Sequence, residues 1–340
     1  MSVSTLADLE LEKLCALVEQ IGNTPLQAIY LDLNSTPREV YLKLEGANPG
    51  GSVKARTAYA LIQHLEEYKL LKKDSVILES TSGNLGVALA MIAKARGYHF
   101  RAITDLKATQ ENVDKMQSLG AEVEVVTRDD KTGGFLLTRL ERIEELCRSS
   151  SRYVWTNQYS NIANPAIHYQ QTGPELYHQM HGKVDVVFIA VSTGGTLAGI
   201  GRYFRAVSPQ TRIIGVDVKG SVIFGTPPGP RKLTGIGAAR PSDFITRELY
   251  DTYMLVGDAE AFAFCHALYA ATGIKVGGSS GAVLAACARY LAEHPKIKRP
   301  VCLCPDTGEN YSSSIFNMQW LEQHHIDLVG QLGPVTGIRP

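Results

Sequence analysis

An alternation of strand-like and helix-like segments, running from about Ser75 to the C-terminal region, constrains the fold of this chain most strongly. The predicted strands are Ser75–Glu79, Phe100–Thr104, Glu122–Thr127, Asp185–Val191, Arg212–Val218 and Val301–Cys304. The predicted helices are Gly86–Arg96, Gln110–Leu119, Phe135–Cys147, Gly195–Val207, Ala259–Thr272 and Gly281–His294. The order predicts an α/β fold in which helices cover mainly parallel sheets.

Composition and charge exclude several classes of partner. The formal net charge is zero, with 34 basic and 34 acidic residues and no long basic run, so we expect no nucleic-acid partner. No apolar run approaches membrane-spanning length, and Met1–Gln20 lacks the order of a signal peptide, so we expect a cytoplasmic protein without membrane contact. The six cysteines are dispersed, which favours buried free thiols over disulfides or a metal site.

Lys54 lies in the first turn of a predicted helix, directly after the turn Asn48–Val53. Free peptide N–H groups and the positive end of the helix dipole destabilise an ammonium group there, so we expect a lowered pKa. No carboxylate occurs between Glu45 and Glu66, so Lys54 has no acidic partner one turn away. A neutral lysine amine can hold an aldehyde cofactor as a Schiff base; the alternative is an ordinary surface lysine.

Three further loops precede predicted helices, where ligands of parallel α/β folds bind. Ser192–Thr196 can surround a phosphate with N–H groups and two threonines, although a simple tight turn has the same pattern. Ser80–Gly86 offers three hydroxyls and an amide, which suit a small carboxylate, whereas N-capping would require one hydroxyl. Gly277–Gly281 alone predicts only N-capping. Together with Lys54, the loops match pyridoxal 5′-phosphate and an amino acid.

On these motifs the chain resembles the cysteine synthase and cystathionine β-synthase family of fold-type II pyridoxal-phosphate enzymes. The similar stretch runs from Ile21–Leu26 (Ile-Gly-Asn-Thr-Pro-Leu) to Pro305–Tyr311 (Pro-Asp-Thr-Gly-Glu-Asn-Tyr). The resemblance implies a homodimer and two α/β domains with the cofactor in the cleft between them. We expect the smaller domain at 44–157, the larger cofactor domain at 1–43 and 158–330, and a tail at 331–340.

The resemblance also implies roles for individual residues, with Lys54 catalytic and no metal. The residues expected to bind the cofactor are Lys54, Asn84, Ser192, Thr193, Gly194, Gly195, Thr196 and Ser280. Those expected to bind the substrates are Ser80, Thr81, Ser82, Gln158, Tyr159, Ser192 and Arg240. Ser280 would meet the pyridine nitrogen without forcing it to be protonated, which suits the loss of a good leaving group.

The reaction that this family resemblance implies is a ping-pong β-replacement by a transferase. The amino-acid substrate displaces Lys54 from the internal aldimine, and the freed amine removes the α-proton. The β-substituent leaves, an aminoacrylate remains, and a second nucleophile adds to its β-carbon.

Three positions depart from ordinary cysteine synthases. Leu85 replaces a threonine in the carboxylate loop, Tyr159 replaces a phenylalanine after Gln158, and Ser192 stands where a glycine is common. Tyr159 and Ser192 add polar groups that a site for sulfide does not need. They favour a larger acceptor that forms hydrogen bonds.

The long loop rich in glycine and proline, Lys219–Asp243, strengthens this departure. Val218–Gly225, Gly235–Arg240 and Glu79–Lys94 resemble synthases that join O-phospho-L-serine to L-glutamate. Their product, N-(2-amino-2-carboxyethyl)-L-glutamate, is the precursor of 2,3-diaminopropionate in siderophore and peptide-antibiotic pathways. Arg240 replaces a small residue, and its guanidinium suits the phosphate of O-phosphoserine; the alternative is a surface arginine.

Two other functions stay open at this point. One is a cysteine synthase that uses O-acetylserine or O-phosphoserine with sulfide. The other is a non-catalytic relative that serves as a binding or regulatory module, against which Lys54 and the Ser279-Ser280-Gly281 motif count. A cystathionine β-synthase is disfavoured, since neither a haem-binding extension nor a regulatory domain is evident.

Overall fold

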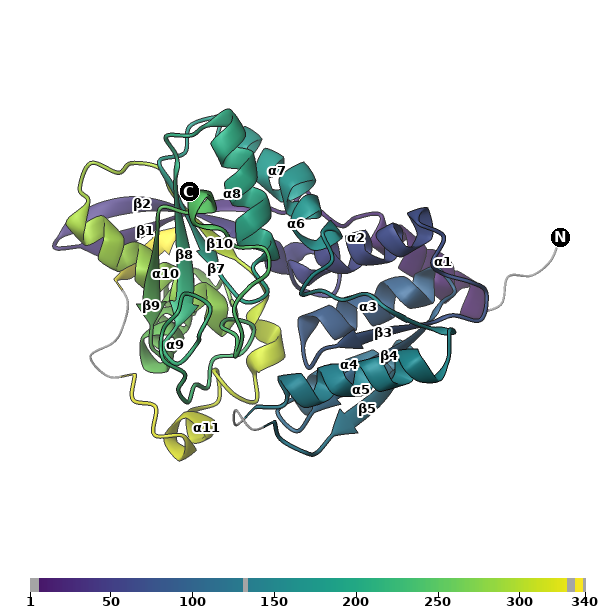
Figure 1. The fold of residues 1–340 in the computed structure, drawn as a ribbon. Coiled ribbons are helices and arrows are strands. Elements are labelled where there is room, and N and C mark those ends of the chain that lie inside the picture. The colour runs from purple at the N-terminus through teal and green to yellow at the C-terminus, as the bar shows by residue number, and fades with distance from the viewer. Residues whose placement is uncertain (1–5, 131–133, 329–333, 339–340) are drawn as a thin grey trace. The chain divides into compact units, whose positions relative to one another are not determined.

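The computed structural model describes residues 6–130, 134–328 and 334–338, and the chain divides into two compact units (Figure 1). Unit 1 comprises 1–23 and 48–164, and unit 2 comprises 24–47 and 165–340. This division differs from the expected one, because 44–47 belong to the larger unit, and 1–23 and 158–164 belong to the smaller unit. There, α1 (Leu6–Val18) packs on α3 (Asn84–Ala95), and the Cys15 thiol donates to the Ala95 carbonyl at 3.3 Å.

Unit 1 is built on a four-stranded parallel sheet with the strand order β5-β4-β3-β6. Its strands are β3 (Val76–Ser80), β4 (His99–Asp105), β5 (Glu122–Val126) and β6 (Tyr153–Trp155). Besides α1 and α3, its helices are α2 (Lys54–Glu67), α4 (Gln110–Ser118) and α5 (Leu136–Ser149), with α6 (Ala163–Ile167) beginning at its end. The strands alternate their buried side chains between two helical layers, as residues of a doubly covered sheet do.

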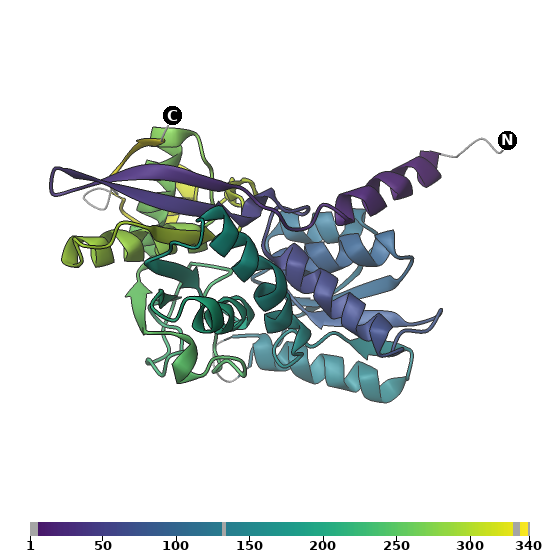
Figure 2. The same cartoon turned by 90° about the horizontal axis from the view of Figure 1, so that it is seen from above.

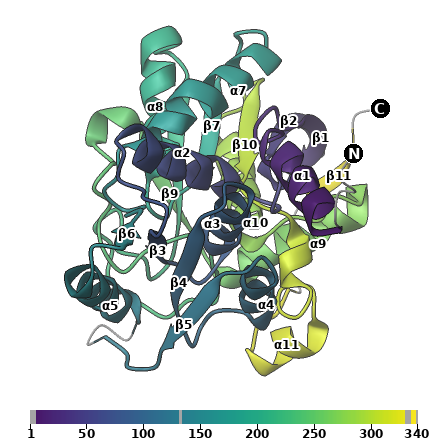
Figure 3. The ribbon, with the colours of Figure 1, turned by 90° about the vertical axis from the view of Figure 1, so that its right-hand side faces the viewer.

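Strand β3 shows this alternation. Ile77 belongs to the core formed with α2, α3 and α4, whereas Leu78 packs with Ile143 and Leu146 of α5. Figure 3 shows α5 on one side of the strands and α3 and α4 on the other. The carboxyl ends of β3 and β4 therefore lie side by side, and the loops that follow them leave from one edge of the sheet.

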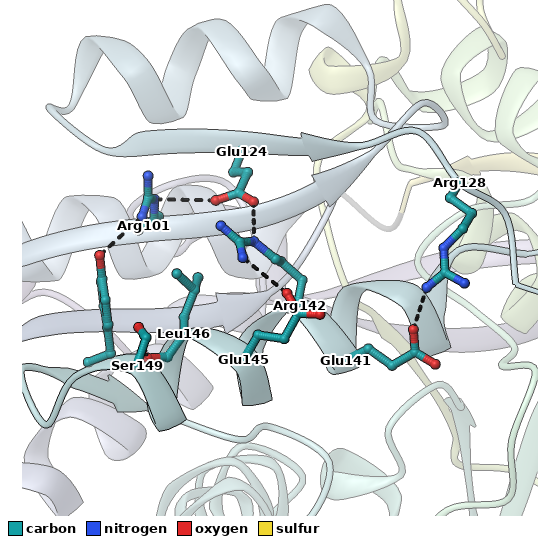
Figure 4. A network of polar contacts seen from close by, with 9 residues as sticks. Arg101, Glu124, Arg128, Glu141, Arg142, Glu145, Leu146 and Ser149 are labelled. Atoms are coloured by element: carbon teal, nitrogen blue, oxygen red, sulfur yellow. Dashed lines mark hydrogen bonds and ion pairs between the residues drawn. The ribbon is translucent and has the colours of Figure 1, made fainter.

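A partly exposed polar network joins α5 to the sheet (Figure 4). Arg142 of α5 pairs with Glu124 of β5 and, at 3.1 Å, with Glu145 one turn further along its own helix. Arg101 of β4 donates to the hydroxyl of Tyr153 at 3.3 Å and lies 3.7 Å from Glu124. Such solvent-screened pairs add little stability one by one, so the packing of Ile143 and Leu146 on the strands holds α5 more than they do.

Unit 2 contains a seven-stranded mixed sheet with the order β11-β1-β2-β10-β7-β8-β9. Its strands are β1 (Leu26–Leu33), β2 (Thr36–Leu44), β7 (Val186–Ala190), β8 (Arg212–Val218), β9 (Thr252–Val256), β10 (Pro300–Cys304) and β11 (Val335–Ile338). Its α-helices are α7 (Gly173–Gln179), α8 (Gly195–Val207), α9 (Asp258–Thr272), α10 (Gly278–Glu293) and α11 (Met318–Gln323). It also has a π-helical turn at His168–Thr172 and short 3₁₀ turns at Glu45–Ala47, Arg247–Leu249 and Gly308–Tyr311.

Strand β7 separates two hydrophobic cores in unit 2. Phe188 packs in the core that contains α9 and α10, and Val187 and Ile189 pack in the core that contains α7 and α8. The long β1–β2 hairpin, purple in Figure 2, is antiparallel, and β11 adds to its outer strand. Residues 335–338 of the expected tail therefore form a strand, while 331–333 and 339–340 lie outside the described residues.

The predicted α/β fold with mainly parallel sheets is confirmed. All six cysteines are free; Cys265, Cys287, Cys302 and Cys304 are buried and the other two are partly buried. Among the described residues, no helix combines the length and apolar character needed to cross a bilayer.

Candidate active site

Lys54 begins α2, as the sequence predicted, and its backbone N–H donates to the Ser52 hydroxyl at 3.3 Å. Burial lowers the pKa of Lys54 to about 8, while the negative charge of Glu79 raises it in part. The direction agrees with the prediction, but the main cause is the loss of solvent around the amine, although its side chain keeps some exposure. Glu79 was not expected near Lys54, because this acid comes from a strand and not from the same helix.

The carboxylate loop lies between β3 and α3. The Thr81 hydroxyl accepts hydrogen bonds from the backbone N–H groups of Gly86 at 3.0 Å and Gly83 at 3.4 Å, which leaves its own proton for donation. Gly86 must be small, since a Cβ there would lie 2.4 Å from the sulfur of Met116. The buried Ser80 Oγ has no hydrogen-bond partner among the described residues, so the loop keeps a donor in reserve for a ligand.

Gln158 approaches this loop from the chain that leaves β6. Its side-chain Nε2 donates to the Ser80 carbonyl at 2.9 Å, and its own carbonyl accepts from Asn164 Nδ2 at 2.7 Å. The structure thus brings Gln158 together with Ser80, and Thr81, Ser82 and Asn84 follow Ser80 directly in the chain. Tyr159 is the next residue after Gln158 and is partly buried.

A buried ion pair that the sequence analysis missed lies beyond the carboxyl end of the neighbouring strand. Arg139, in the first turns of α5, has its Nε 3.3 Å from Oδ2 of Asp105, the last residue of β4. Both side chains are almost fully buried, and Arg139 Nε has no hydrogen bond among the described residues. An arginine within a helical pattern gives no signal of this burial in the sequence.

The predicted phosphate loop of unit 2 follows β7 and opens α8. Gly194 has φ +91°, and a Cβ there would lie 2.2 Å from Oγ of Ser242, so the turn requires glycine. Ser242 donates to the Thr193 carbonyl at 2.6 Å, and Ser192 donates to the Gly237 carbonyl at 3.2 Å. The two ends of the segment 237–242 are therefore tied to the phosphate loop.

Arg240 lies within that tied segment. It forms an ion pair with Asp243 at 2.7 Å and is partly exposed. The long loop 219–243 is irregular, as its composition predicted.

His168 is a further residue that the sequence analysis missed. It is fully buried in the π-helical turn, with Nε2 3.2 Å from the Thr196 hydroxyl and Nδ1 2.9 Å from the Thr172 hydroxyl. The imidazole therefore fixes the orientation of the Thr196 hydroxyl, which is predicted to bind the cofactor phosphate. A π-helical turn often marks a functional position, but no pattern in the sequence announces it.

Ser280 lies in the first turn of α10 and is fully buried. Its Oγ makes no hydrogen bond among the described residues, although it lies near the Cys304 thiol. Burial raises the pKa of Cys304 to about 12, and the Ser280 hydroxyl opposes this rise. A neutral thiol is only a weak acceptor, so the Ser280 hydroxyl stays available as a donor to a ligand.

The features of each unit, taken by itself, fit a different part of pyridoxal 5′-phosphate. Unit 1 supplies an amine of lowered pKa, Lys54, for the aldehyde. Unit 2 supplies a glycine turn at a helix N-terminus, around Gly194, which suits a phosphate. It also supplies the buried, unpartnered hydroxyl of Ser280, which suits a pyridine nitrogen.

Comparison with known proteins agrees with this donor set. A family model described as pyridoxal-phosphate dependent enzyme matches residues 17–306. The chain is 40% identical over 325 residues to N-(2-amino-2-carboxyethyl)-L-glutamate synthase of Ralstonia nicotianae, with 96% of both chains covered. It is 39% identical over 309 residues to the synthase of the same name from Cupriavidus metallidurans, with 90% of this chain and 91% of that protein covered.

Solved structures give the same picture of the fold. A hydrogen sulfide-producing enzyme from Fusobacterium nucleatum superposes with a TM-score of 0.80 at 32% identity, covering 86% of this chain and 96% of that one. O-ureido-L-serine synthase superposes with a TM-score of 0.79 at 30% identity, covering 88% and 94%. The chain belongs to the family of pyridoxal-phosphate dependent enzymes.

Proposed function

We propose that this enzyme converts O-phospho-L-serine and L-glutamate to N-(2-amino-2-carboxyethyl)-L-glutamate and phosphate by β-replacement. The observation that carries the proposal is the 40% identity, across 96% of both chains, to a synthase named for that product. The product would supply 2,3-diaminopropionate to siderophore or peptide-antibiotic synthesis. A homodimeric state and a cytoplasmic location are parts of the same proposal.

The cofactor, when bound, supplies an electron-withdrawing ring that acidifies the α-carbon of an attached amino acid. Lys54 is the group that would bond to it and later hold the α-proton on Nζ. An amine with a pKa of about 8 is neutral in about one molecule in ten at pH 7, far more often than a solvated lysine, so it can accept that proton and return it. Lys54 is thus proposed as both the attachment point and the general base.

The remaining cofactor contacts are proposed by residue type and place. The N–H groups of the Thr193–Thr196 turn and its two hydroxyls would hold the phosphate, with Ser192 at the start of the turn. Ser280 would donate to the pyridine nitrogen, and Asn84, the first residue of α3, would contact the ring hydroxyl. Support comes from the positive φ of Gly194 and from the unpartnered Ser280 hydroxyl.

The amino-acid carboxylate is proposed to bind in the loop after β3. The hydroxyls of Ser80, Thr81 and Ser82 and the amide of Gln158 give a set of neutral donors at the N-terminus of α3. Thr81 is suited to this task because its oxygen already accepts two backbone hydrogen bonds, which aims its proton elsewhere.

Two arginines are candidates for the phosphate of O-phosphoserine. Arg240 remains our sequence-based proposal, and its ion pair with Asp243 would have to open or be shared. Arg139 is a second candidate, because it is a buried guanidinium beyond the carboxyl edge of the sheet that also carries the carboxylate loop. Tyr159 and Ser192 would contact the glutamate acceptor.

A cysteine synthase that uses sulfide is the second candidate. The observation that favours it is the structural similarity, with a TM-score of 0.81 at 29% identity, to O-acetyl serine sulfhydrylase isoform 3 from Entamoeba histolytica. Because this identity is lower than the 40% found for the synthase named for the glutamate product, the sulfide reaction is the second candidate.

The two functions are separated by mixing the holoenzyme with O-phosphoserine and recording the cofactor absorbance. A new band should form, and glutamate should return the spectrum to that of the resting enzyme and yield the expected product by mass spectrometry. If sulfide discharges the band and glutamate does not, the second function replaces the first. Arg139→Lys and Arg240→Lys tested in parallel should identify the phosphate ligand by a raised KM for O-phosphoserine.

A further inference from the structure

Glu79, the penultimate residue of β3, has a fully buried carboxylate that accepts four hydrogen bonds. Oε1 accepts from the Ser80 N–H at 2.7 Å and from Trp155 Nε1 at 3.4 Å. Oε2 accepts from the Thr156 hydroxyl at 2.5 Å and from the Gln158 N–H at 2.9 Å. Burial raises the pKa of Glu79, and these hydrogen bonds oppose the rise. Three of the four partners, the N–H groups of Ser80, Gln158 and Trp155, can only donate, which favours the ionised carboxylate.

The four donors join two segments that are far apart in the sequence. Strand β6 is only three residues long and pairs with β3 through Val76–Leu78, so its ladder alone holds it weakly. Glu79 adds to that pairing by accepting from Trp155, the last residue of β6, and from Thr156 and Gln158 beyond the strand. Because Gln158 in turn donates to the Ser80 carbonyl, the carboxylate fixes both sides of the proposed substrate-carboxylate cradle.

The same carboxylate is the acid that acts on the pKa of Lys54 among the described residues. Two other charged residues lie on the neighbouring elements. Arg56 is buried on α2. Arg101 of β4 forms ion pairs with Glu122 and Glu124 of β5. Strand β6 contributes Tyr153, whose hydroxyl accepts from Arg101 at 3.3 Å. Glu79 is thus placed to act on the amine and on the cradle at once.

We propose that Glu79 is a positioning residue of the reaction: its buried carboxylate holds Gln158 in the substrate cradle and places a negative charge near Lys54. The inference rests on the roles proposed above for Lys54 and Gln158. The charge itself is needed, because a glutamine of the same size would turn an NH₂ group toward a backbone N–H of Ser80 or Gln158.

The first test measures Lys54 in the cofactor-free enzyme. The rate of acetylation of Lys54 by acetic anhydride, followed by peptide mass spectrometry, gives the midpoint of its titration. In Glu79→Gln the midpoint should fall by roughly half a unit or more, since the lost negative charge no longer favours the ammonium. Asp105→Asn is the matched control: it removes another buried carboxylate of unit 1 and should leave the midpoint unchanged. An unshifted midpoint in folded Glu79→Gln overturns the proposal.

The second test separates positioning from stability. Thr156→Val removes one donor from Glu79 but keeps its charge, so it should raise KM for O-phosphoserine about fivefold, as expected for a loss near 1 kcal/mol, with a smaller change in kcat. Trp155→Phe, which removes the longer bond, should do the same more weakly. Thr156→Val and Trp155→Phe test the positioning role even if Glu79→Gln does not fold. A wild-type KM for O-phosphoserine in both variants contradicts the proposal.

The two tests also separate this inference from the proposed function. If the cofactor proves not to be attached to Lys54, the role of that residue in catalysis fails, yet the titration midpoint of Lys54 still reports whether Glu79 acts on it. If attachment at Lys54 is found but neither the midpoint nor KM responds, the proposed function stands and the positioning role of Glu79 is wrong.

Discussion

The buried imidazole of His168 forms a hydrogen bond with the Thr196 hydroxyl, with Nε2 3.2 Å from Oγ1. The other ring nitrogen is engaged by Thr172 at 2.9 Å, so the ring has little freedom to turn. The π-helical turn that carries His168 thereby orients a hydroxyl at the N-terminus of α8, where we propose that the cofactor phosphate binds.

His168→Ala should therefore weaken cofactor binding. Loss of one orienting hydrogen bond corresponds to about 1 kcal/mol, or roughly a fivefold higher Kd for pyridoxal 5′-phosphate, measured by fluorescence titration of the cofactor-free enzyme. His266→Ala is the control, because that histidine bonds the Ile315 carbonyl and not the phosphate loop. Equal affinities in His168→Ala and the wild type would show that Thr196 needs no support.

Gly194→Ala should cost both stability and cofactor affinity. The substitution meets two obstacles, a φ of +91° and a contact of 2.2 Å between the new Cβ and Ser242 Oγ. Gly225→Ala is the matched control, since Gly225 has φ +79° but no atom within 4 Å of the added Cβ. Chemical unfolding should give a loss of about 1 kcal/mol for the control and clearly more for Gly194→Ala. Similar losses would contradict the close packing of Ser242 on the turn.

Ser280→Ala should have opposite consequences in the cofactor-free and cofactor-bound enzymes. Removing a buried hydroxyl without a partner should leave the cofactor-free protein as stable as before, or slightly more stable. Cofactor affinity should fall about fivefold through the loss of one hydrogen bond. Thermal unfolding with and without cofactor measures both effects; a destabilised cofactor-free protein would mean that Ser280 Oγ has a structural partner.

The capture of cofactor should depend on pH through Lys54. Only the neutral amine attacks an aldehyde, so the rate of cofactor attachment to the cofactor-free enzyme should rise with pH and level off above a midpoint of about 8. An unburied lysine would give a midpoint near 10.4. Stopped-flow absorbance measures the rate, and Lys54→Arg should abolish this phase. A midpoint above 10 would contradict the effect of burial on Lys54.

Local patterns in the sequence predicted the elements that position the site. The predicted α8 and β8 have the bounds that the structure shows, and the start of α2 at Lys54 is as expected. In these segments the apolar periodicity and the flanking glycines favour the same local structure that the sheet then buries. The β1–β2 hairpin was not predicted, although Ile29, Leu31, Val40 and Leu42 are buried at alternating positions, the pattern of a half-buried strand.

The supporting residues could not be predicted, because their roles arise from contacts between distant segments. Glu79 is defined by donors from Thr156 and Gln158, which follow it by 77 and 79 positions. His168 reaches Thr196 across 28 positions. Hydrogen bonds of this kind leave no periodic signal, and they become visible only when the strands are paired.

The most direct test of the account is to reduce the holoenzyme with borohydride, digest it and locate the pyridoxyl group by mass spectrometry. We expect one modified residue, Lys54, and no label in Lys54→Arg. A pyridoxyl group on another lysine, or a reduced wild-type enzyme without any, would contradict the assignment of Lys54 as the reactive amine.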